Sequence, residues 1–159
     1  MKMMTRLFLI NGLILLWPNI GMGFDYNSLA SAVAVAESNG DNQAVGDNGK
    51  ARGAYQMWRI AWDQVNKERA KEKRYRYPWA YAHDPFVSKQ YAVEYLRWCG
   101  GLLEKQLGRK PYYWEVYAAY ARGPTTFIEE HDCSYSKLPA RTHRAIGVIA
   151  AQLKEIPPR

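Results

Sequence analysis

A stretch rich in glycine, asparagine and aspartate, residues 41–54, interrupts a chain that otherwise shows helical spacing. Before it, apolar side chains recur at helical intervals over residues 26–38, and Gly40 is a natural stop for a helix. Within it, the Asp-Asn-Gly sequence of residues 47–49 lies between two short runs, which is typical of a tight β-hairpin. We therefore expect a helix over residues 26–38, followed by one small hairpin.

Helical spacing returns after the hairpin and continues through most of the chain. Asp84-Pro85 is a strong helix start, because the aspartate can cap the helix and proline suits its first turn. The pair Gly100-Gly101 is expected to end one helix before the next begins. These signals predict helices over residues 56–70, 86–99, 102–107, 111–120 and 139–154. The sequence thus predicts a mainly α fold, a single helical domain with one small β-hairpin.

The first 23 residues have the pattern of a secretory signal peptide. Two basic residues precede an apolar run over residues 7–16, and glycines occupy the third and first positions before a cleavage point at Phe24. An uncleaved membrane anchor is the alternative, but the run is well short of the roughly 20 residues that span a bilayer. We expect export to the periplasm or the medium, no stable membrane insertion after cleavage, and one folded domain over residues 24–159.

The chain is basic, and its charge narrows the choice of partner. The formal net charge is +7, and Lys2 and Arg6 lie in the predicted signal peptide, which leaves +5 on the exported part. A basic exported protein suits an anionic partner such as a cell-wall polymer or a membrane surface. Nucleic acid would also suit the charge, but export argues against it. We expect a monomer that needs no cofactor.

Cysteine and histidine are few. An even pair of cysteines, Cys99 and Cys133, suggests one disulfide in an exported protein, with two buried thiols as the alternative. The histidines are His83, His131 and His143, and none has metal-ligand spacing with the cysteines. No metal site is predicted.

Glu37 is the strongest candidate for chemistry. It falls in the last turn of the first expected helix, where the helix dipole is negative, and alanine and valine flank it. Both surroundings raise the pKa of a carboxyl group. A carboxylic acid that stays protonated near neutral pH can protonate a leaving-group oxygen, which cleavage of a glycosidic bond requires. The alternative is an ordinary exposed glutamate at a helix end.

Residues after Glu37 favour the sugar-cleaving interpretation. Glycines over residues 46–53 allow a backbone to approach a ligand closely. Gln56 can both donate and accept hydrogen bonds, as binding of an acetamido sugar demands. Four aromatic side chains offer flat faces to sugars, with core packing as the alternative for each. They are Tyr55, Trp58, Trp62 and Tyr120.

Three motifs occur in a recognisable order. Glu37-Ser38 comes first, Gly-x-x-Gln over residues 53–56 second, and Tyr120 within Ala-Ala-Tyr-Ala-Arg-Gly-Pro third. In the order and spacing of these motifs, the chain resembles the lytic transglycosylases and goose-type lysozymes over residues 26–150. The resemblance implies a lysozyme-like fold and an enzyme that cleaves the glycan strands of peptidoglycan.

The resemblance also implies roles for individual residues. Glu37 would be the single general acid/base, protonating the β-1,4 oxygen between N-acetylmuramic acid and N-acetylglucosamine. In the transglycosylase reaction it then accepts a proton from the muramic 6-hydroxyl, which closes an anhydro ring, while the substrate's acetamido group supports the positive charge. The residues implied in substrate binding are Ser38, Gly53, Tyr55, Gln56 and Tyr120.

Two features leave other functions open. Ala121 stands where the family motif Ala-Tyr-Asn-Ala-Gly has asparagine, and the lost polar contact is compatible with a non-catalytic peptidoglycan-binding protein on the same fold. Asp47 is a candidate second carboxylate for a hydrolytic lysozyme, or else a simple turn residue. A retaining pair of carboxyls lies roughly 5 Å apart and an inverting pair roughly 6.5–9.5 Å apart.

Overall fold

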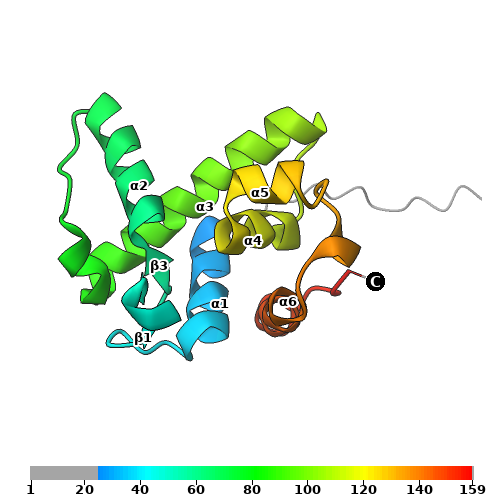
Figure 1. Ribbon diagram of the computed structural model, residues 1–159, viewed down its shortest axis with the longest axis horizontal. Coiled ribbons are helices and arrows are strands. Elements are labelled where there is room, and N and C mark those ends of the chain that lie inside the picture. The colour runs from blue at the N-terminus through cyan, green and yellow to red at the C-terminus, as the bar shows by residue number, and fades with distance from the viewer. Residues whose placement is uncertain (1–24, 159) are drawn as a thin grey trace, which may run out of the picture.

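The first expected helix forms as α1, Tyr26–Ser38, in the computed structural model, which describes residues 25–158 (Figure 1). The Asp25 side chain accepts hydrogen bonds from the backbone N–H groups of Asn27 and Ser28, satisfying donors that a helix start leaves free. Asn39, with φ 56°, ends the helix in the left-handed conformation. The predicted signal peptide lies outside the described residues.

The predicted hairpin is confirmed, and a third strand extends it. Strands β1, Val45–Gly46, and β2, Ala51–Arg52, pair antiparallel around the 3-10 turn η1, Asp47–Gly49. Strand β3, Met57–Trp58, then pairs antiparallel with β2. The described residues therefore form a small sheet in the order β1-β2-β3, directly after α1.

The helix after the sheet is α2, Arg59–Lys71, and the short 3-10 helix η2, Trp79–His83, leads into α3, Pro85–Leu107. Asp84 caps α3 as the sequence predicts, accepting from two backbone N–H groups. The predicted stop at Gly100-Gly101 is wrong, since α3 runs through both glycines. A Cβ atom on Gly100 would lie 2.1 Å from the Tyr26 hydroxyl, so this glycine lets α1 approach α3 closely.

The second half of the chain is helical. It contains α4, Tyr113–Arg122, then α5, Pro124–Glu129, the 3-10 turn η3, Tyr135–Lys137, and α6, Ala140–Leu153. The glycine and proline at residues 123–124 separate α4 from α5. A mainly α fold with a small antiparallel sheet, as predicted, is confirmed. Among the described residues, no helix is both long and apolar enough to cross a membrane.

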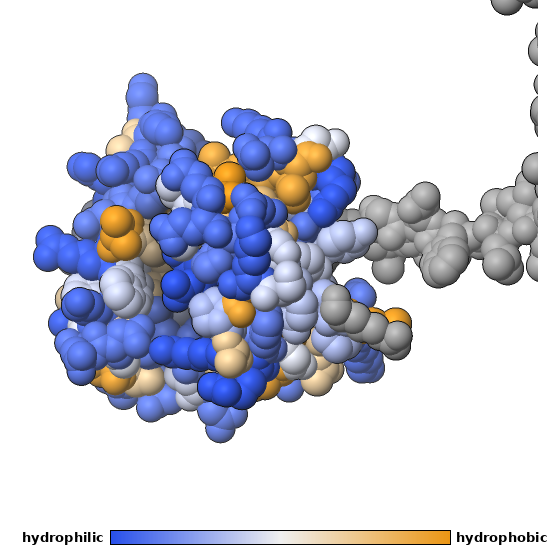
Figure 2. Space-filling model, turned by 45° about the vertical axis from the view of Figure 1, so that its right-hand side comes forward, coloured by the Kyte–Doolittle hydropathy of each residue, from blue (hydrophilic) through white to orange (hydrophobic). Residues whose placement is uncertain are grey.

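The core forms where α1 packs against α3 and α6, and where α4 packs against α3 (Figure 1). Leu29, Val33, Leu96, Val116 and Ile149 are fully buried there. Hydrophilic side chains cover most of the face drawn in Figure 2.

The cysteines do not form the suggested disulfide. Both thiols are free, Cys99 buried within α3 and Cys133 partly exposed. The core is therefore held together without a covalent link between these two positions.

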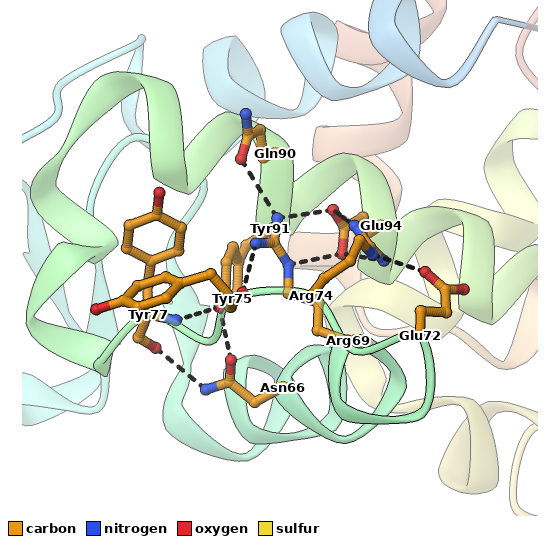
Figure 3. A network of polar contacts seen from close by, with 9 residues as sticks. All are labelled: Asn66, Arg69, Glu72, Arg74, Tyr75, Tyr77, Gln90, Tyr91 and Glu94. Carbon is orange, nitrogen blue, oxygen red and sulfur yellow. Dashed lines mark hydrogen bonds and ion pairs between the residues drawn. The ribbon is translucent and has the colours of Figure 1, made fainter.

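A polar network fixes α2 and the segment after it to α3 (Figure 3). The buried Arg69 guanidinium donates to both carboxylate oxygens of Glu94, at 3.0 and 2.8 Å, and to the Tyr75 carbonyl at 3.0 Å. Arg74 donates to the same carboxylate, and the Tyr91 hydroxyl donates to Asn66 at 2.6 Å. This network positions α2, which forms part of the wall of a surface groove.

Candidate active site

A groove with a volume of about 1160 Å³ opens on the surface, and Glu37 lines it. One wall comes from the β-sheet and α2, the other from α4, α5 and the start of α6, and α3 also contributes to the lining. Aromatic side chains contribute part of the wall, namely Trp58, Tyr95, Trp98, Tyr117 and Tyr120. A groove of this size with flat aromatic faces can hold a chain of sugar rings.

Glu37 is anchored by one oxygen. It lies in the last turn of α1, and the Tyr117 hydroxyl on α4 donates to its Oε1 atom at 2.7 Å. Within residues 25–158, the Oε2 atom has no hydrogen-bond partner in the protein. Since one oxygen is held by Tyr117, the other remains available to carry a proton into the groove.

The pKa of Glu37 is raised above its ordinary value. Burial is the largest cause, because it penalises the charged form. The hydrogen bond from Tyr117 and the charge of Arg141 act in the opposite direction, and the nearby Asp47 raises the pKa further. Burial also raises the pKa of Tyr117, which keeps that hydroxyl protonated as a donor. The site therefore favours the protonated acid that the sequence predicts.

Asp47 lines the same groove, but protein groups hold its carboxylate. The Oδ2 atom accepts from the Trp58 indole N–H at 3.1 Å, and the Oδ1 atom accepts from Arg141 at 3.3 Å. Arg141 lies on α6, so this ion pair joins the hairpin turn to α6 beside Glu37. The carboxylate is thus engaged in holding Trp58 and Arg141.

Gln56 and Tyr120 also line the groove, and their polar ends support the loop between β2 and β3. The Tyr120 hydroxyl donates to the Tyr55 carbonyl at 2.6 Å, and the Gln56 amide donates to the Gly53 carbonyl at 3.0 Å. The Gln56 side chain packs over Gly46, where a Cβ atom would lie 2.1 Å from the amide oxygen. Both residues therefore shape the wall and keep the loop in place.

The groove wall formed by the described residues does not include Ser38, Gly53 or Tyr55. The Ser38 hydroxyl donates to the Ala54 carbonyl at 2.8 Å, which ties the end of α1 to the sheet. Gly53 has φ +72°, and a Cβ atom there would lie 1.9 Å from the Ala82 carbonyl oxygen. Tyr55 is buried in the core. Because Gly53 has no side chain, the backbone of η2 can lie against it. Ser38, Gly53 and Tyr55 therefore support the groove wall without lining it.

The aromatic candidates divide between groove and core. Trp58 is 44% exposed and lines the groove. Trp62 is fully buried, and its ring stacks on Tyr91 with ring centres 3.8 Å apart. Trp62 therefore packs in the core, which is the alternative interpretation that the sequence left open.

Two residues that act on Glu37 are not predicted from the sequence. Tyr117 lies three residues before Tyr120 in α4, on the same helix face, so helical spacing from the motif could have identified it. Arg141 reaches the site from α6, far along the chain, and no local pattern distinguishes it from the other basic residues of that helix.

A half-buried glutamate lies beside an aromatic groove, on a helical domain with a small sheet that is consistent with a lysozyme-like fold. The family model described as "Transglycosylase SLT domain" matches residues 24–141, and the chain belongs to this family. The family comprises peptidoglycan-cleaving lytic transglycosylases, within the lysozyme-like superfamily. Comparisons with curated proteins and with solved structures found no significant match. Over residues 25–158, no group of three or more potential metal ligands is found.

Proposed function

We propose that this protein is an exported lytic transglycosylase that cuts the β-1,4 bond between N-acetylmuramic acid and N-acetylglucosamine, with Glu37 as the single general acid/base. One observation carries the proposal: a carboxyl group with a raised pKa lies in the groove and is held by one oxygen only. Membership of the transglycosylase family supports the same reaction.

In the first step, protonated Glu37 donates its proton to the bridging oxygen, and the bond between that oxygen and muramic C1 breaks. The positive charge that develops at C1 is supported by the substrate's own acetamido group. The Glu37 carboxylate then takes the proton of the muramic 6-hydroxyl, whose oxygen bonds to C1 and closes the 1,6-anhydro ring. Glu37 ends protonated, ready for the next cleavage.

Tyr117 and Arg141 support this cycle from the protein side. The Tyr117 hydroxyl stabilises the carboxylate that forms after the first proton transfer, because a hydrogen bond to the charged form favours it. The positive charge of Arg141 acts in the same direction. Burial favours the protonated form, so the opposing influences allow Glu37 to act in turn as acid and as base.

We also propose that residues 1–23 form a cleaved signal peptide, because the substrate lies outside the cytoplasm. The basic and apolar segments of this stretch and its two glycines support the proposal. N-terminal sequencing of the exported protein tests it, and Phe24 is the first residue expected.

The experiment that tests the reaction compares wild type with Glu37→Gln on purified peptidoglycan, by zymography and by mass analysis of the soluble products. We expect clearing by the wild type, products with anhydro ends that are one water lighter than reducing ends, and no clearing by Glu37→Gln. Glu129→Gln is the matched control, because Glu129 is an exposed acid on α5 outside the groove wall. Equal clearing by wild type and Glu37→Gln would refute the proposal.

Ala121 favours a second candidate, a non-catalytic peptidoglycan-binding protein, because it lines the groove where the family motif has a polar asparagine. This candidate predicts that wild type and Glu37→Gln sediment equally with peptidoglycan and that neither releases soluble products. The same mass analysis also distinguishes a hydrolytic lysozyme, which would leave reducing ends.

A further inference from the structure

Three basic side chains in the groove wall have no ion-pair partner among residues 25–158. They are Lys50, Lys67 and Arg122. Three other charged residues of the wall are in ion pairs: Arg141 pairs with Asp47 at 3.3 Å, and Asp63 pairs with Arg59 at 3.7 Å. We call the three unpaired cations the basic rim.

The members of the basic rim come from three different parts of the groove wall. Lys50 follows the hairpin turn, Lys67 lies on α2, and Arg122 is the last residue of α4. All three are exposed. The Lys50 ammonium lies 5.7 Å from the centre of the Trp58 ring, which places it beside an aromatic face of the wall. A strand in the groove would therefore pass between positive charges on both sides.

Few acids offset this charge. Glu130 is the one carboxylate of the described groove wall, apart from Glu37, that no ion pair neutralises. Glu37 itself has a raised pKa, mainly through burial, which favours its neutral form. The groove wall therefore carries an excess of unpaired positive charge at neutral pH.

We propose that the basic rim binds carboxylates borne by the glycan strand, on its peptides or on lactyl groups that carry no peptide, so that the enzyme prefers acidic strands over neutralised ones. The proposal rests on the proposed function. The aromatic side chains of the wall offer flat faces for sugar rings, whereas the three rim residues line the groove and are exposed, so groups that project from a strand would be able to reach them. Exposed charges of this kind act over a Debye length of about 8–10 Å and weaken in salt.

The test compares soluble peptide-bearing strands with the same strands after their carboxyls have been converted to neutral amides. The measured quantity is the ratio of kcat/KM values for the two substrates. We expect the wild type to prefer untreated strands by about tenfold, as three weak surface contacts would allow, and the variant Lys50→Gln/Lys67→Gln/Arg122→Gln to lose most of this preference. Salt at about 0.5 M should reduce the wild-type preference in the same way.

The control variant Lys89→Gln/Lys105→Gln/Lys110→Gln makes the same change in net charge at exposed positions outside the groove, and it should keep the wild-type ratio. The basic rim would be refuted if both triple variants and the wild type showed one common ratio. A wild type that cleaves neither substrate would instead refute the proposed function.

A third substrate separates the two sources of carboxylate. An amidase that hydrolyses the bond between the lactyl group and the peptide removes the peptide and leaves a lactyl carboxylate in its place. Cleavage as fast as that of untreated strands shows that the rim binds the lactyl carboxylate as well as the peptide carboxylates, and cleavage as slow as that of amidated strands assigns the recognition to the peptide.

Discussion

The Tyr117 hydroxyl donates a hydrogen bond to Glu37 Oε1 at 2.7 Å and joins α4 to the last turn of α1. Tyr117 is buried, and its pKa is raised by burial, so the hydroxyl stays protonated and remains a donor whatever the protonation state of Glu37. The contact therefore determines which oxygen of the Glu37 carboxyl is held by the protein and which one is left without a partner.

Replacing Tyr117 with phenylalanine should change both the pKa of Glu37 and the orientation of its carboxyl group. The two effects can be measured separately. The hydrogen bond favours the ionised carboxylate, so its loss raises the pKa of Glu37 further. The proposed reaction needs protonated Glu37, and we therefore expect the alkaline limb of the pH–rate profile to move to higher pH. We expect kcat at the optimum to fall about tenfold, through the lost orientation.

Tyr113→Phe is the control for this change, because Tyr113 is a tyrosine buried in the same helix whose hydroxyl donates to the Ile156 carbonyl. It should leave the pH–rate profile in place. A Tyr117→Phe profile that coincides with the wild-type profile would show that the hydroxyl does not act on Glu37.

Glu37→Gln should stabilise the protein at neutral pH. The pKa of Glu37 is raised in the folded state, mainly by burial, so the folded protein loses stability as pH rises from about 4.5 through that raised pKa. Each pKa unit corresponds to about 1.4 kcal/mol. We expect Glu37→Gln to unfold at a higher temperature than wild type near pH 8, and the difference to disappear below about pH 4. A lower melting temperature for Glu37→Gln at pH 8 would contradict the burial of this charge.

Asp47→Asn should slow the reaction only moderately. The amide can still accept from the Trp58 indole, and the lost ion pair to Arg141 is exposed and worth less than about 1 kcal/mol. We expect the rate to fall less than tenfold and the products to keep anhydro ends. Asp47 also raises the pKa of Glu37, so the alkaline limb should move slightly to lower pH. A loss as complete as that of Glu37→Gln would instead identify Asp47 as a second catalytic carboxylate.

Glu94→Gln tests the network between α2 and α3. Burial alone would raise the pKa of Glu94, but hydrogen bonds from Arg69 and Arg74 outweigh burial and hold it below its usual value. Removing the carboxylate leaves the buried Arg69 without its anion, and we expect a loss of about 2–4 kcal/mol in urea unfolding at pH 7. The loss should shrink in acid, because wild-type Glu94 becomes protonated as pH falls through its lowered pKa.

Glu68→Gln is the control for the network. Glu68 pairs with Lys71 at 2.9 Å on the exposed side of α2, and such a pair contributes about 0.5 kcal/mol. Equal losses for Glu94→Gln and Glu68→Gln would mean that the network of Figure 3 adds nothing beyond surface charge.

Gly53→Ala should destabilise the fold by about 3 kcal/mol, because a side chain there is strained by the positive φ and meets the Ala82 carbonyl. Gly101→Ala is its counterpart. Gly101 lies inside α3, and a Cβ atom added there would meet no atom within 4 Å, so alanine should stabilise the helix by about 0.5–1 kcal/mol. Thermal unfolding of both variants measures the contrast, and destabilisation by both would show that helix α3 needs glycine at 101 as well.

Local signals explain what could be predicted. Asp25 and the pair Asp84-Pro85 each start a helix through contacts with the next few residues, and the turn over residues 47–49 closes between strands only a few positions apart. Glu37 follows from the same logic, because its position at a helix end and its apolar flank can be read from its neighbours in the sequence.

Contacts between distant segments explain what could not be predicted. In the sequence, Gly100 resembles a helix stop. In the fold, the Tyr26 side chain of α1 packs where a side chain at Gly100 would lie. The sequence alone does not distinguish Trp58 from Trp62. The turn from β3 into α2 leaves Trp58 exposed and buries Trp62. Gly53 looks suited to a ligand, and its close neighbour is the backbone of η2.

The packing of α1 against α6 bears on when the fold can be completed during synthesis. α1 leaves the ribosome early in synthesis, whereas α6, which completes its packing and brings Arg141 to the groove, emerges only after α2, α3, α4 and α5. Since α1 packs against α6, the core around α1 and the groove beside it can be complete only after translation through α6.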